Sequence, residues 1–447
     1  MRLNVLNIRD VAERQFCCGC GVCAYLSPDE IRMVDTLDYG RRPLLRSAVP
    51  RDPRTVDALK VCPGIELAHS FDRRDPNLIR QLVDGWGPVR EVWEGYAADP
   101  ETRFAGSSGG AASALALYCI ERLGFHGVLH IAARPDVPYL NYTVLSTTRA
   151  EILAATGSRY APASPCDGLQ MIEDAPASCV FIGKPCDVAA VAKARHLRPE
   201  LDRKLGLTIA IFCAATPSTR GTLELLRKVG VQDPASVVGL RYRGRGWPGQ
   251  FEVAVKTRDG IERRAMSYVA AWDHLQRYRQ WRCSLCPDHT GEFADISVGD
   301  PWYRTRGEKE LGHSIVLVRT HRGQQVVRGA MNARHLELKR ITAEVFDGLS
   351  PVQPKVRGML WGRLLALRLM GAPTPRFCGL PMFRYWLGTL TVKQKLQSLY
   401  GTARRVFTKR LWRPHRVQEY VPLASTKQQM TAIGEQHAAA AAAPFGE

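Results

Sequence analysis

The sequence of 447 residues predicts an α/β protein with a mixed sheet, a small cysteine-rich module before it and a basic helical extension after it. Three observations support this prediction. Cysteines with metal-ligand spacing occur in residues 1–85, strand-like apolar segments alternate with helical ones from residue 86 onward, and basic residues concentrate beyond residue 345. A chain of this length is expected to form two or three domains with substantial apolar cores.

The N-terminal module contains a cysteine motif. Cys17, Cys20 and Cys23 are spaced three residues apart, and the distant Cys62 is followed by proline. This arrangement matches the ligands of a 4Fe-4S cluster in bacterial ferredoxins, whereas zinc modules usually supply thiolates as two separated pairs. We therefore predict one 4Fe-4S cluster on these four cysteines. Cys18 breaks the spacing, and we interpret it as a bystander rather than a ligand.

The spacing of apolar residues predicts the secondary structure. Residues 1–85 are rich in Arg, Asp and Pro and show little periodicity, so we expect loops that a bound cluster organises. A helix is predicted over residues 110–123, ended by Gly124. Strands are predicted at residues 92–96, 127–131, 178–183, 207–213, 251–255 and 314–318. Helices between several of these strands favour an α/β core.

Changes in composition divide the chain into five predicted segments. They are a 4Fe-4S module over residues 1–85, the N-terminal part of the core over 86–165, its C-terminal part over 166–345, a basic helical extension over 346–424 and a disordered tail over 425–447. The tail is assigned because it is polar and contains a run of alanines.

The composition also indicates the compartment. No apolar run is long enough to span a bilayer, and the first residues lack the apolar stretch of a secretory signal. Thirteen cysteines, an odd number with several in metal-ligand spacing, favour a reducing environment over a disulfide framework. We therefore expect a cytoplasmic protein, with contact at the inner face of the membrane as an option.

The net charge of +19 is concentrated near the C-terminus. Residues 348–418 contain fourteen Lys and Arg and no Asp or Glu, which leaves +5 for the rest of the chain. Apolar and aromatic residues interleave with these cations at helical spacing. Three interpretations remain open: helices packed on the core with a solvated basic face, docking on an anionic membrane surface, or an acidic protein or nucleic acid partner. Nucleic acid is the least favoured, because no signature of a nucleic-acid-binding fold occurs.

Four further cysteines occupy suggestive positions. Cys186 follows a glycine turn, Cys213 ends an apolar strand, and Cys283 and Cys286 form a CxxC pair. Each signal is weak alone, because a strand-end cysteine is usually a small buried apolar residue and a CxxC pair suits zinc or redox chemistry as well as iron–sulfur. Spacing leaves open whether the four form a second site.

Three glycine-containing turns suggest phosphate binding. Residues 103–111 form a loop of small residues directly before the predicted helix, so backbone amides and the helix N-terminus can approach a phosphate. A plain flexible loop is the alternative. Similar turns occur at residues 157–160 and 183–185. Residues 244–249 match the spacing of a dinucleotide fingerprint, but a strand follows them and a proline interrupts them, so we reject a Rossmann loop.

Together these motifs carry a family resemblance. The chain resembles the beta subunits of coenzyme F(420) hydrogenases and dehydrogenases over roughly residues 89–322. The motifs that carry the resemblance, in the same order, are residues 103–111, 157–160, 182–187, 212–213, 242–249 and 283–300. The N-terminal segment resembles longer members, which include 7-hydroxymethyl chlorophyll a reductase and a divinyl chlorophyllide reductase. The C-terminal region is similar to bacterial members found among polysaccharide-biosynthesis proteins.

The resemblance implies a mixed-sheet flavoprotein core with a ferredoxin-like module and two 4Fe-4S clusters. The second cluster is expected on Cys186, Cys213, Cys283 and Cys286. FAD is expected at the loop Ser107, Ser108, Gly109 and Gly110, with Gly157, Ser158, Tyr160 and Lys184 nearby.

Two residues are candidates for catalysis under this resemblance. Lys184 is expected to stabilise a reduced, anionic flavin ring, and His289 to supply protons. For His289, Asp288, Asp295 and Asp300, bracing of the CxxC loop is the favoured alternative.

The leading functional interpretation is an FAD- and iron–sulfur-dependent oxidoreductase. It relays electrons between a ferredoxin-like, deazaflavin or nicotinamide donor and an organic substrate. The alternative is an electron-transfer beta subunit of a larger dehydrogenase or hydrogenase complex, without substrate chemistry of its own. The expected partner is a ferredoxin-like donor or a dehydrogenase subunit.

Overall fold

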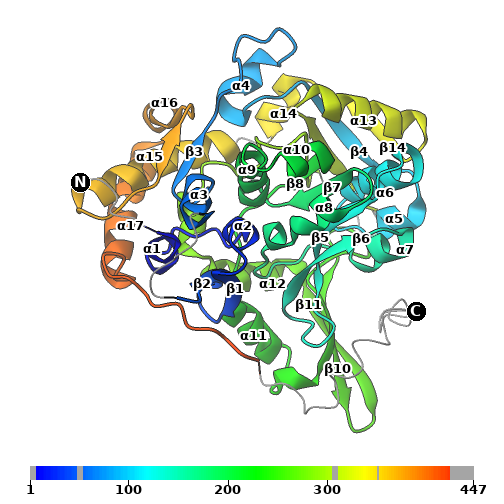
Figure 1. Cartoon of the computed structure of the whole chain (residues 1–447), viewed down its shortest axis with the longest axis horizontal. Helices are drawn as coiled ribbons and strands as arrows, with labels where there is room; N and C mark the ends of the chain where they lie inside the picture. The colour runs from blue at the N-terminus through cyan, green and yellow to red at the C-terminus, as the bar shows by residue number, and fades with distance from the viewer. Residues whose placement is uncertain (1–6, 48–53, 305–310, 350–351, 423–447) are drawn as a thin grey trace.

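An eight-stranded mixed sheet forms the centre of the computed structural model, which describes residues 7–47, 54–304, 311–349 and 352–422 (Figure 1). The strand order is β14-β4-β13-β12-β8-β7-β5-β6. These strands are β4 (Glu91–Ala97), β5 (Gly127–Ala133), β6 (Asn141–Ser146), β7 (Cys179–Gly183), β8 (Leu205–Ile211), β12 (Ile296–Gly299), β13 (Ser314–Val318) and β14 (Leu336–Arg340). The predicted α/β class with a mixed sheet is confirmed. The predicted tail over 425–447 lies outside the described residues.

The four central strands are parallel. β12, β8, β7 and β5 pair in parallel, and the flanking strands pair antiparallel to them. The carboxyl ends of the parallel strands therefore lie at the same edge of the sheet. The predicted strand over 207–213 ends two residues early, at Ile211, so Cys213 lies in the loop beyond this edge.

Alternating side chains of the central strands enter two different apolar layers. Val128 and Val180 pack with α6 (Ala111–Leu123) and α13 (His321–Asn332) on one face. Leu129 and Phe181 pack on the other face with α8 (Gln170–Asp174), α9 (Pro185–Ala194) and the N-terminal module. The helix predicted over 110–123 is α6, and Gly124 caps it in the left-handed conformation. Further helices around the sheet are α5 (Pro100–Ala105), α7 (Arg149–Ala154), α10 (Pro199–Lys204) and α14 (Ala343–Leu349).

A second, antiparallel sheet has the order β11-β10-β9. Its strands and covering helices are β9 (Val237–Arg241), β10 (Gln250–Thr257), β11 (Gly260–Ser267), α11 (Thr219–Lys228) and α12 (Tyr268–Leu275). Residues 244–249 connect two antiparallel strands of this sheet. The rejection of a Rossmann loop at this position is therefore confirmed.

The N-terminal module has more regular structure than its sequence suggests. It contains α1 (Ile8–Glu13), α2 (Val22–Leu26), β1 (Ile31–Thr36), β2 (Gly40–Leu45), α3 (Arg54–Lys60), β3 (Glu66–Ala68) and α4 (Arg80–Trp86). The expectation of loops is wrong for the hairpin β1–β2. Its alternation is hidden because Arg42 on β2 is buried, where it donates to the Gln280 side chain at 3.1 Å.

The C-terminal extension packs against this module, as the neighbouring blue and orange segments of Figure 1 show. Its elements are α15 (Val352–Leu369), β15 (Arg376–Cys378), α16 (Met382–Gly388) and α17 (Val392–Thr408). β15 pairs in parallel with β3, and Arg32 forms an ion pair with Glu419 at 2.6 Å. The predicted basic helices are thus present. No helix within the described ranges combines the length and the apolar character that a bilayer crossing requires.

Candidate functional site

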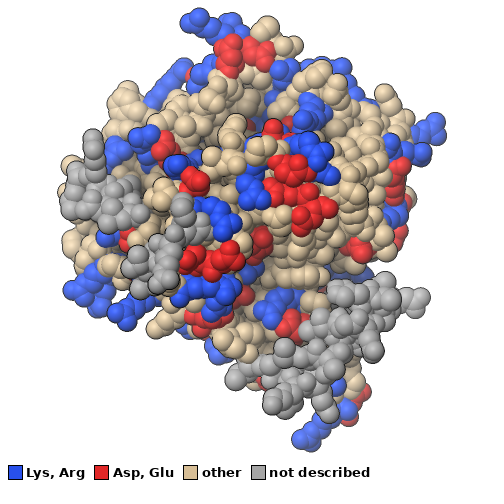
Figure 2. All heavy atoms as spheres, in the orientation of Figure 1, with Lys and Arg blue, Asp and Glu red and all other residues tan. Residues whose placement is uncertain are grey.

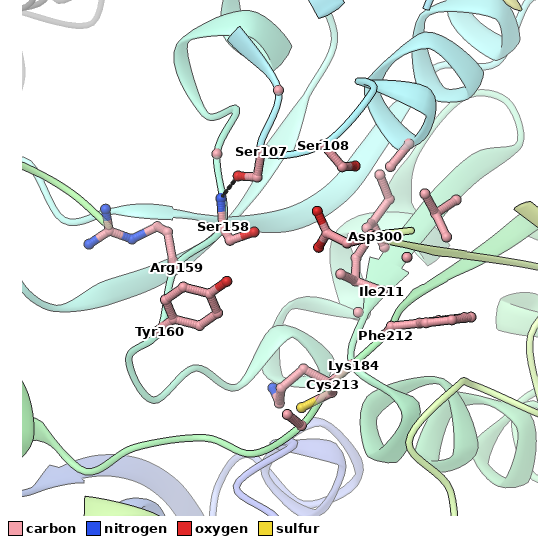
Figure 3. A pocket seen from close by; sticks show the side chains of 18 of the residues that line it. Ser107, Ser108, Ser158, Arg159, Tyr160, Lys184, Ile211, Phe212, Cys213 and Asp300 are labelled. Atoms are coloured by element: carbon pink, nitrogen blue, oxygen red, sulfur yellow. Dashed lines mark hydrogen bonds between the residues drawn. The ribbon is translucent and has the colours of Figure 1, made fainter. Parts of the chain in front are cut away.

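A cavity of about 720 Å³ lies at the edge where the parallel strands end. Lys184 directly follows β7, Cys213 comes two residues after β8, and Asp300 directly follows β12; all three line the cavity. Figure 3 shows Lys184 and Cys213 at one end of the view and the loops of Ser107 and Ser158 at the other. Open α/β sheets commonly bind ligands at this carboxyl edge.

Two glycines shape the loop before α6. Gly110 has a φ of +73°, and a Cβ there would lie 2.5 Å from the carbonyl oxygen of Thr102. A Cβ on Gly109 would lie 2.7 Å from the carbonyl oxygen of Gly95. Because Gly110 is the N-cap and has no side chain, the first-turn N–H groups of α6 lack a side-chain acceptor and border the cavity. Such a helix N-terminus stabilises an anion.

The serines of this loop hold neighbouring segments together. The backbone N–H of Ser158 donates to Ser107 Oγ, which joins two of the predicted turns (Figure 3). Ser108 Oγ lies 2.8 Å from Ser314 Oγ at the start of β13, and Gly109 N–H donates to the same Ser314 oxygen at 3.0 Å. Ser107 and Ser108 line the cavity, whereas Gly109 packs behind it. These hydroxyls therefore set the shape of the loop.

The turn at residues 157–160 supplies an aromatic wall. Gly157 has a φ of +104°, and a Cβ there would lie 3.2 Å from the Arg243 carbonyl oxygen. The Tyr160 hydroxyl points into the cavity and lies 3.4 Å from the Tyr268 hydroxyl (Figure 3). Arg159 points away and donates to backbone carbonyls of a neighbouring loop. The predicted Gly157, Ser158 and Tyr160 are thus brought to the same cavity.

Sequence reasoning missed a buried ion pair beside these loops. Arg243 donates two hydrogen bonds to Asp300, at 2.8 and 2.9 Å, and Trp247 Nε1 donates to the same carboxylate at 3.0 Å. The Arg243 guanidinium also lies over the rings of Tyr268 and Trp302, at 4.9 and 5.1 Å. The sequence offered one signal for this pair, an aspartate directly after a short apolar strand. Asp300 lines the cavity, so the pair fixes this part of its wall.

Lys184 enters the cavity as one half of an ion pair. Its Nζ lies 2.6 Å from Asp187 Oδ2, and the same carboxylate accepts the Lys184 backbone N–H at 2.9 Å. Burial lowers the pKa of Lys184, but attraction to Asp187 and to neighbouring thiols outweighs it, so the net shift is upward. Lys184 therefore stays charged, and Asp187 balances that charge.

The second set of cysteines converges in the folded chain. Cys186 lies in the first turn of α9, and Cys213 follows β8. Cys283 lies in the 3-10 turn η4 (Trp281–Leu285), and Cys286 follows it. All four line one small pocket beside the cavity. The structure thus brings together four residues whose sequence signals were individually weak.

The small pocket and the large cavity share a wall. Cys213, the residues 214–216 and His289 line both of them. The Cys213 backbone N–H donates to the His289 carbonyl oxygen at 2.9 Å, which holds the two segments of the wall together. A group bound at the second cysteine set and a group bound in the cavity would therefore be neighbours.

Cys18 lies beside the second cysteine set rather than the first. It lines the small pocket, and its thiol is hydrogen-bonded to that of Cys186. Its neighbours in sequence, Cys17 and Cys20, belong to the first set. Cys18 therefore lies between the two cysteine sets. The spacing of cysteines along the chain does not reveal this position.

The first cysteine set is buried in the N-terminal module. Cys17, Cys20, Cys23 and Cys62 belong to one apolar cluster, and mutual repulsion of their thiolates adds to burial in raising the pKa of Cys23. Cys166, which the sequence analysis did not assign, contacts this set: its backbone N–H donates to the Cys20 carbonyl oxygen at 2.9 Å.

Neither set surrounds a single-ion site. Within the described parts of the chain, no group of three or more His, Cys, Asp or Glu converges closely enough to hold one metal ion. The four thiolates of a cubane bind four different irons. The thiolates around a cubane consequently lie farther apart than the ligands of a single metal ion.

Burial controls protonation near the shared wall. It raises the pKa of Cys213 to about 12, whereas a hydrogen bond from the adjacent thiol lowers that of Cys18 to about 6. Burial, together with the charges of Arg363 and Arg279, lowers the pKa of His289 to about 4. The imidazole of His289 is thus neutral at neutral pH.

The aspartates around the CxxC loop serve structural roles. The two carboxylate oxygens of Asp288 accept the backbone N–H groups of residues 290–292 at 2.8 Å each. Asp295 accepts the backbone N–H and the hydroxyl of Thr208 at 2.9 and 2.8 Å. This geometry agrees with the bracing role expected of Asp288 and Asp295.

Comparison with known families identifies both parts of the core. The profile of the N-terminal part of the coenzyme F(420) hydrogenase/dehydrogenase beta subunit matches residues 92–170, and the profile of its C-terminal part matches residues 177–344. Together these ranges cover more than half of the chain. They contain the cavity loops and the second cysteine set, but neither includes the N-terminal cysteines or the C-terminal extension.

Individual relatives are distant. The chain is 27% identical to the coenzyme F(420) hydrogenase subunit beta of Methanococcus voltae, over 60% of this chain and 90% of the relative. It is 24% identical to the F(420)-dependent formate dehydrogenase 1 subunit beta of Methanococcus maripaludis, over 56% and 61% respectively. For the coenzyme F(420) hydrogenase subunit beta of Methanothermobacter thermautotrophicus the identity is 24%, over 65% and 99%.

A solved structure also aligns with the chain. It is a chain of the xenon-derivatised F(420)-reducing NiFe hydrogenase complex from Methanosarcina barkeri. The alignment has a TM-score of 0.47 and 24% identity, and covers 62% of this chain and 90% of that chain.

Proposed function

We propose a function for this chain from the family to which it belongs, the coenzyme F(420) hydrogenase/dehydrogenase beta subunits. The proposed function is that of an electron-transfer subunit that works with a partner oxidoreductase subunit. The relatives are named as subunits of hydrogenases and dehydrogenases, which supports this alternative better than the leading interpretation of a self-sufficient enzyme.

The wall shared by the cysteine pocket and the cavity carries this proposal. Electrons pass efficiently only between centres that lie close together, and Cys213 and His289 border both sites. Cys18 touches Cys186 from the side of the first set. These contacts support an electron path from the first cysteine set through the second to the cavity.

We assign FAD to the cavity and 4Fe-4S clusters to the two cysteine sets. The cavity volume of about 720 Å³ lies within the range of cofactor sites, and the uncapped N-terminus of α6 suits a phosphate group. Two sets of four thiols suit two cubanes. A bound flavin exchanges one or two electrons and a cluster exchanges one, which lets the protein join one-electron carriers to a two-electron reaction.

The residues of the chain have distinct roles in this assignment. The first turn of α6 and the Ser107–Gly110 loop bind the anionic part of the cofactor. Lys184, held by Asp187, places a positive charge at the cysteine end of the cavity. Neutral His289 has one nitrogen that can accept a proton and one that can donate. His289 is therefore the candidate for proton exchange. Lys184 is less suited, because its ammonium group already forms an ion pair with Asp187.

A second candidate function is catalysis on an organic substrate by this chain alone. The aromatic wall favours it, because Tyr160, Trp272 and the stacked rings of Tyr268 and Trp302, with centroids 5.6 Å apart, line the cavity and suit contact with a planar molecule. The two candidates differ in whether the isolated chain turns over.

Anaerobic purification tests the cofactor assignment. We expect about eight iron and eight sulfide atoms and one FAD for each chain. A colourless protein containing zinc would contradict the assignment. Turnover of a candidate acceptor by the isolated chain with an artificial reductant would favour the second function. Reduction of the bound flavin without turnover would favour the electron-transfer role.

Replacing Gly110 by alanine is expected to remove FAD from the purified protein. The new Cβ would meet the Thr102 carbonyl oxygen and would also force an unfavourable positive φ on alanine. Visible absorbance of the flavin measures the loss. Gly124→Ala is the matched control, because Gly124 has a similar φ of +68° but no atom within 4 Å of its Cβ position. The control should cost about 1 kcal/mol in stability and keep the flavin; equal flavin loss in both variants would contradict the assigned loop.

A further inference from the structure

The outer face of α17 is apolar, although this face is exposed and does not pack on the rest of the protein. Val392, Leu396, Tyr400 and Phe407 are 71%, 60%, 76% and 64% exposed. Their spacing of four, four and seven residues places them along one side of the helix. Single exposed apolar residues are common on proteins, but a continuous stripe on one helix indicates a surface that binds something.

The fold does not need this stripe. α17 packs on α15 through Ser398, Thr402 and Val406, which are buried. The approach is close, because a Cβ on Gly362 of α15 would lie 1.9 Å from Ser398 Oγ. The inner face of the helix is therefore small and partly polar, while the larger apolar side chains face outward.

Cations surround the stripe. Lys393, Arg404, Lys409 and Arg410 are exposed on the same helix or directly after it, and residues 348–418 contain no Asp or Glu. In Figure 2 Lys and Arg side chains gather at the edge of the molecule where α17 ends. Any surface that covers the stripe must therefore accept apolar groups and carry negative charge around them.

The neighbouring helix α16 carries further exposed apolar side chains. Phe383 and Leu387 on this helix are exposed, and Phe383 lies against the Trp361–Trp386 ring pair of the same extension. Trp412, just beyond α17, is also exposed and packs edge-on against Phe407. Aromatic rings that are partly buried and partly exposed are typical of membrane-interface positions.

We propose that α16 and α17 dock the protein on an anionic lipid bilayer, with α17 lying in the plane of the interface. The apolar stripe enters the boundary of the acyl chains, while the flanking Lys and Arg side chains reach the lipid phosphates. A protein partner is less suited, because the centres of protein interfaces are depleted in lysine and the cations here flank the stripe along its length. Docking by a basic amphipathic helix needs no bilayer-spanning segment.

Docking would place the redox site near the membrane. α15 lies between α17 and the CxxC loop: Arg363 donates to the Ser284 carbonyl oxygen at 2.7 Å, and Gln353 donates to that of Pro287 at 3.1 Å. The extension lies outside both family-matched ranges. The docking surface is thus independent of the proposed electron-transfer role.

Sedimentation of the full chain with lipid vesicles tests this proposal. We expect binding to vesicles that contain phosphatidylglycerol, weak binding to pure phosphatidylcholine, and release by added salt. The double variant Leu396→Gln, Tyr400→Gln should lower the vesicle partition coefficient by about tenfold or more, because two apolar contacts are lost. The control Ile261→Gln removes an apolar side chain of similar exposure, 58%, on β11 and should bind like the parent.

Two measurements separate the alternatives. The absorbance of the bound flavin and the iron content should be equal in all variants. A loss of vesicle binding is therefore distinguishable from a wrong assignment of the flavin and the clusters. Absence of binding to anionic vesicles would overturn the proposal. So would a double variant that still binds vesicles but changes from dimer to monomer by light scattering, since the stripe would then be an interface between copies of the chain.

Discussion

Replacement of Cys186 by alanine is expected to halve the iron content, from about eight to about four atoms for each chain. Cys186 lies with Cys213, Cys283 and Cys286 around one pocket, so its loss removes a ligand of the second cluster only. The first set, Cys17, Cys20, Cys23 and Cys62, is buried in the N-terminal module, and none of its members lines that pocket. Iron and sulfide analysis, with the electron paramagnetic resonance of the reduced protein, measures the outcome.

Two further cysteine variants sharpen this test. Cys18→Ala should retain both clusters, because Cys18 contacts Cys186 without being one of the four predicted ligands. Cys119→Ala is a control for buried thiols: Cys119 lies in α6, and burial alone raises its pKa, to about 12. Loss of both clusters in a folded Cys186→Ala protein would contradict two separate sites. Loss of one cluster in Cys18→Ala would make Cys18 a ligand.

The sequence predicted the parts of the site that depend on local spacing. Glycine turns are local signals, and they singled out the Ser107–Gly110 loop and the turn at Lys184; both border one cavity, which Cys213 also lines. The α/β class and the position of α6 followed in the same way. The family profiles confirm the resemblance that these motifs carried.

Other features depend on contacts between distant segments. The Arg243–Asp300 pair joins residues that follow strands of two different sheets, so neither residue alone signals a role. The contacts of Cys18 with Cys186 and of Cys166 with Cys20 likewise require the N-terminal module to pack on the core. For this reason, the sequence position of Cys18 suggests the first cysteine set as its neighbour, whereas the folded chain places it beside the second set.

The N-terminal module illustrates a different difficulty. Its hairpin buries Arg42, and buried arginines remove the polar–apolar alternation by which strands are recognised. The polar atoms of Arg42 reach partners only in the folded protein. A sequence rule that assigns charged residues to the surface therefore fails here.

Replacement of Arg357 by methionine is expected to destabilise the protein by about 3–5 kcal/mol, because it leaves a buried carboxylate without its cation. Arg357 on α15 forms an ion pair with Glu292 beyond the CxxC loop, and both side chains are almost fully buried. His69 of the N-terminal module shares a hydrogen bond with the same carboxylate at 2.8 Å. One carboxylate thus joins the extension, the module and the core. Denaturant unfolding followed by tryptophan fluorescence measures the loss.

Arg368→Met is the matched control, since Arg368 is exposed on the same helix and its loss should change stability by less than about 1 kcal/mol. The double variant Arg357→Met, Glu292→Leu should recover much of the stability, because no unpaired charge remains. Equal unfolding midpoints for Arg357→Met and Arg368→Met would show that the buried pair does not anchor the extension.

The same pair predicts a dependence on pH. Burial raises the pKa of Glu292, but Arg357 and His69 outweigh this effect and lower it to about 2. A carboxyl with a lowered pKa in the folded state stabilises the protein above its unfolded pKa of about 4.3 and loses that contribution as the pH falls toward 2. Glu292→Gln should therefore be less stable than the parent at pH 7, and the difference should shrink between pH values of about 5 and 2. A constant difference across this window would mean that Glu292 does not titrate with unfolding, and that α15 is held by its apolar contacts instead.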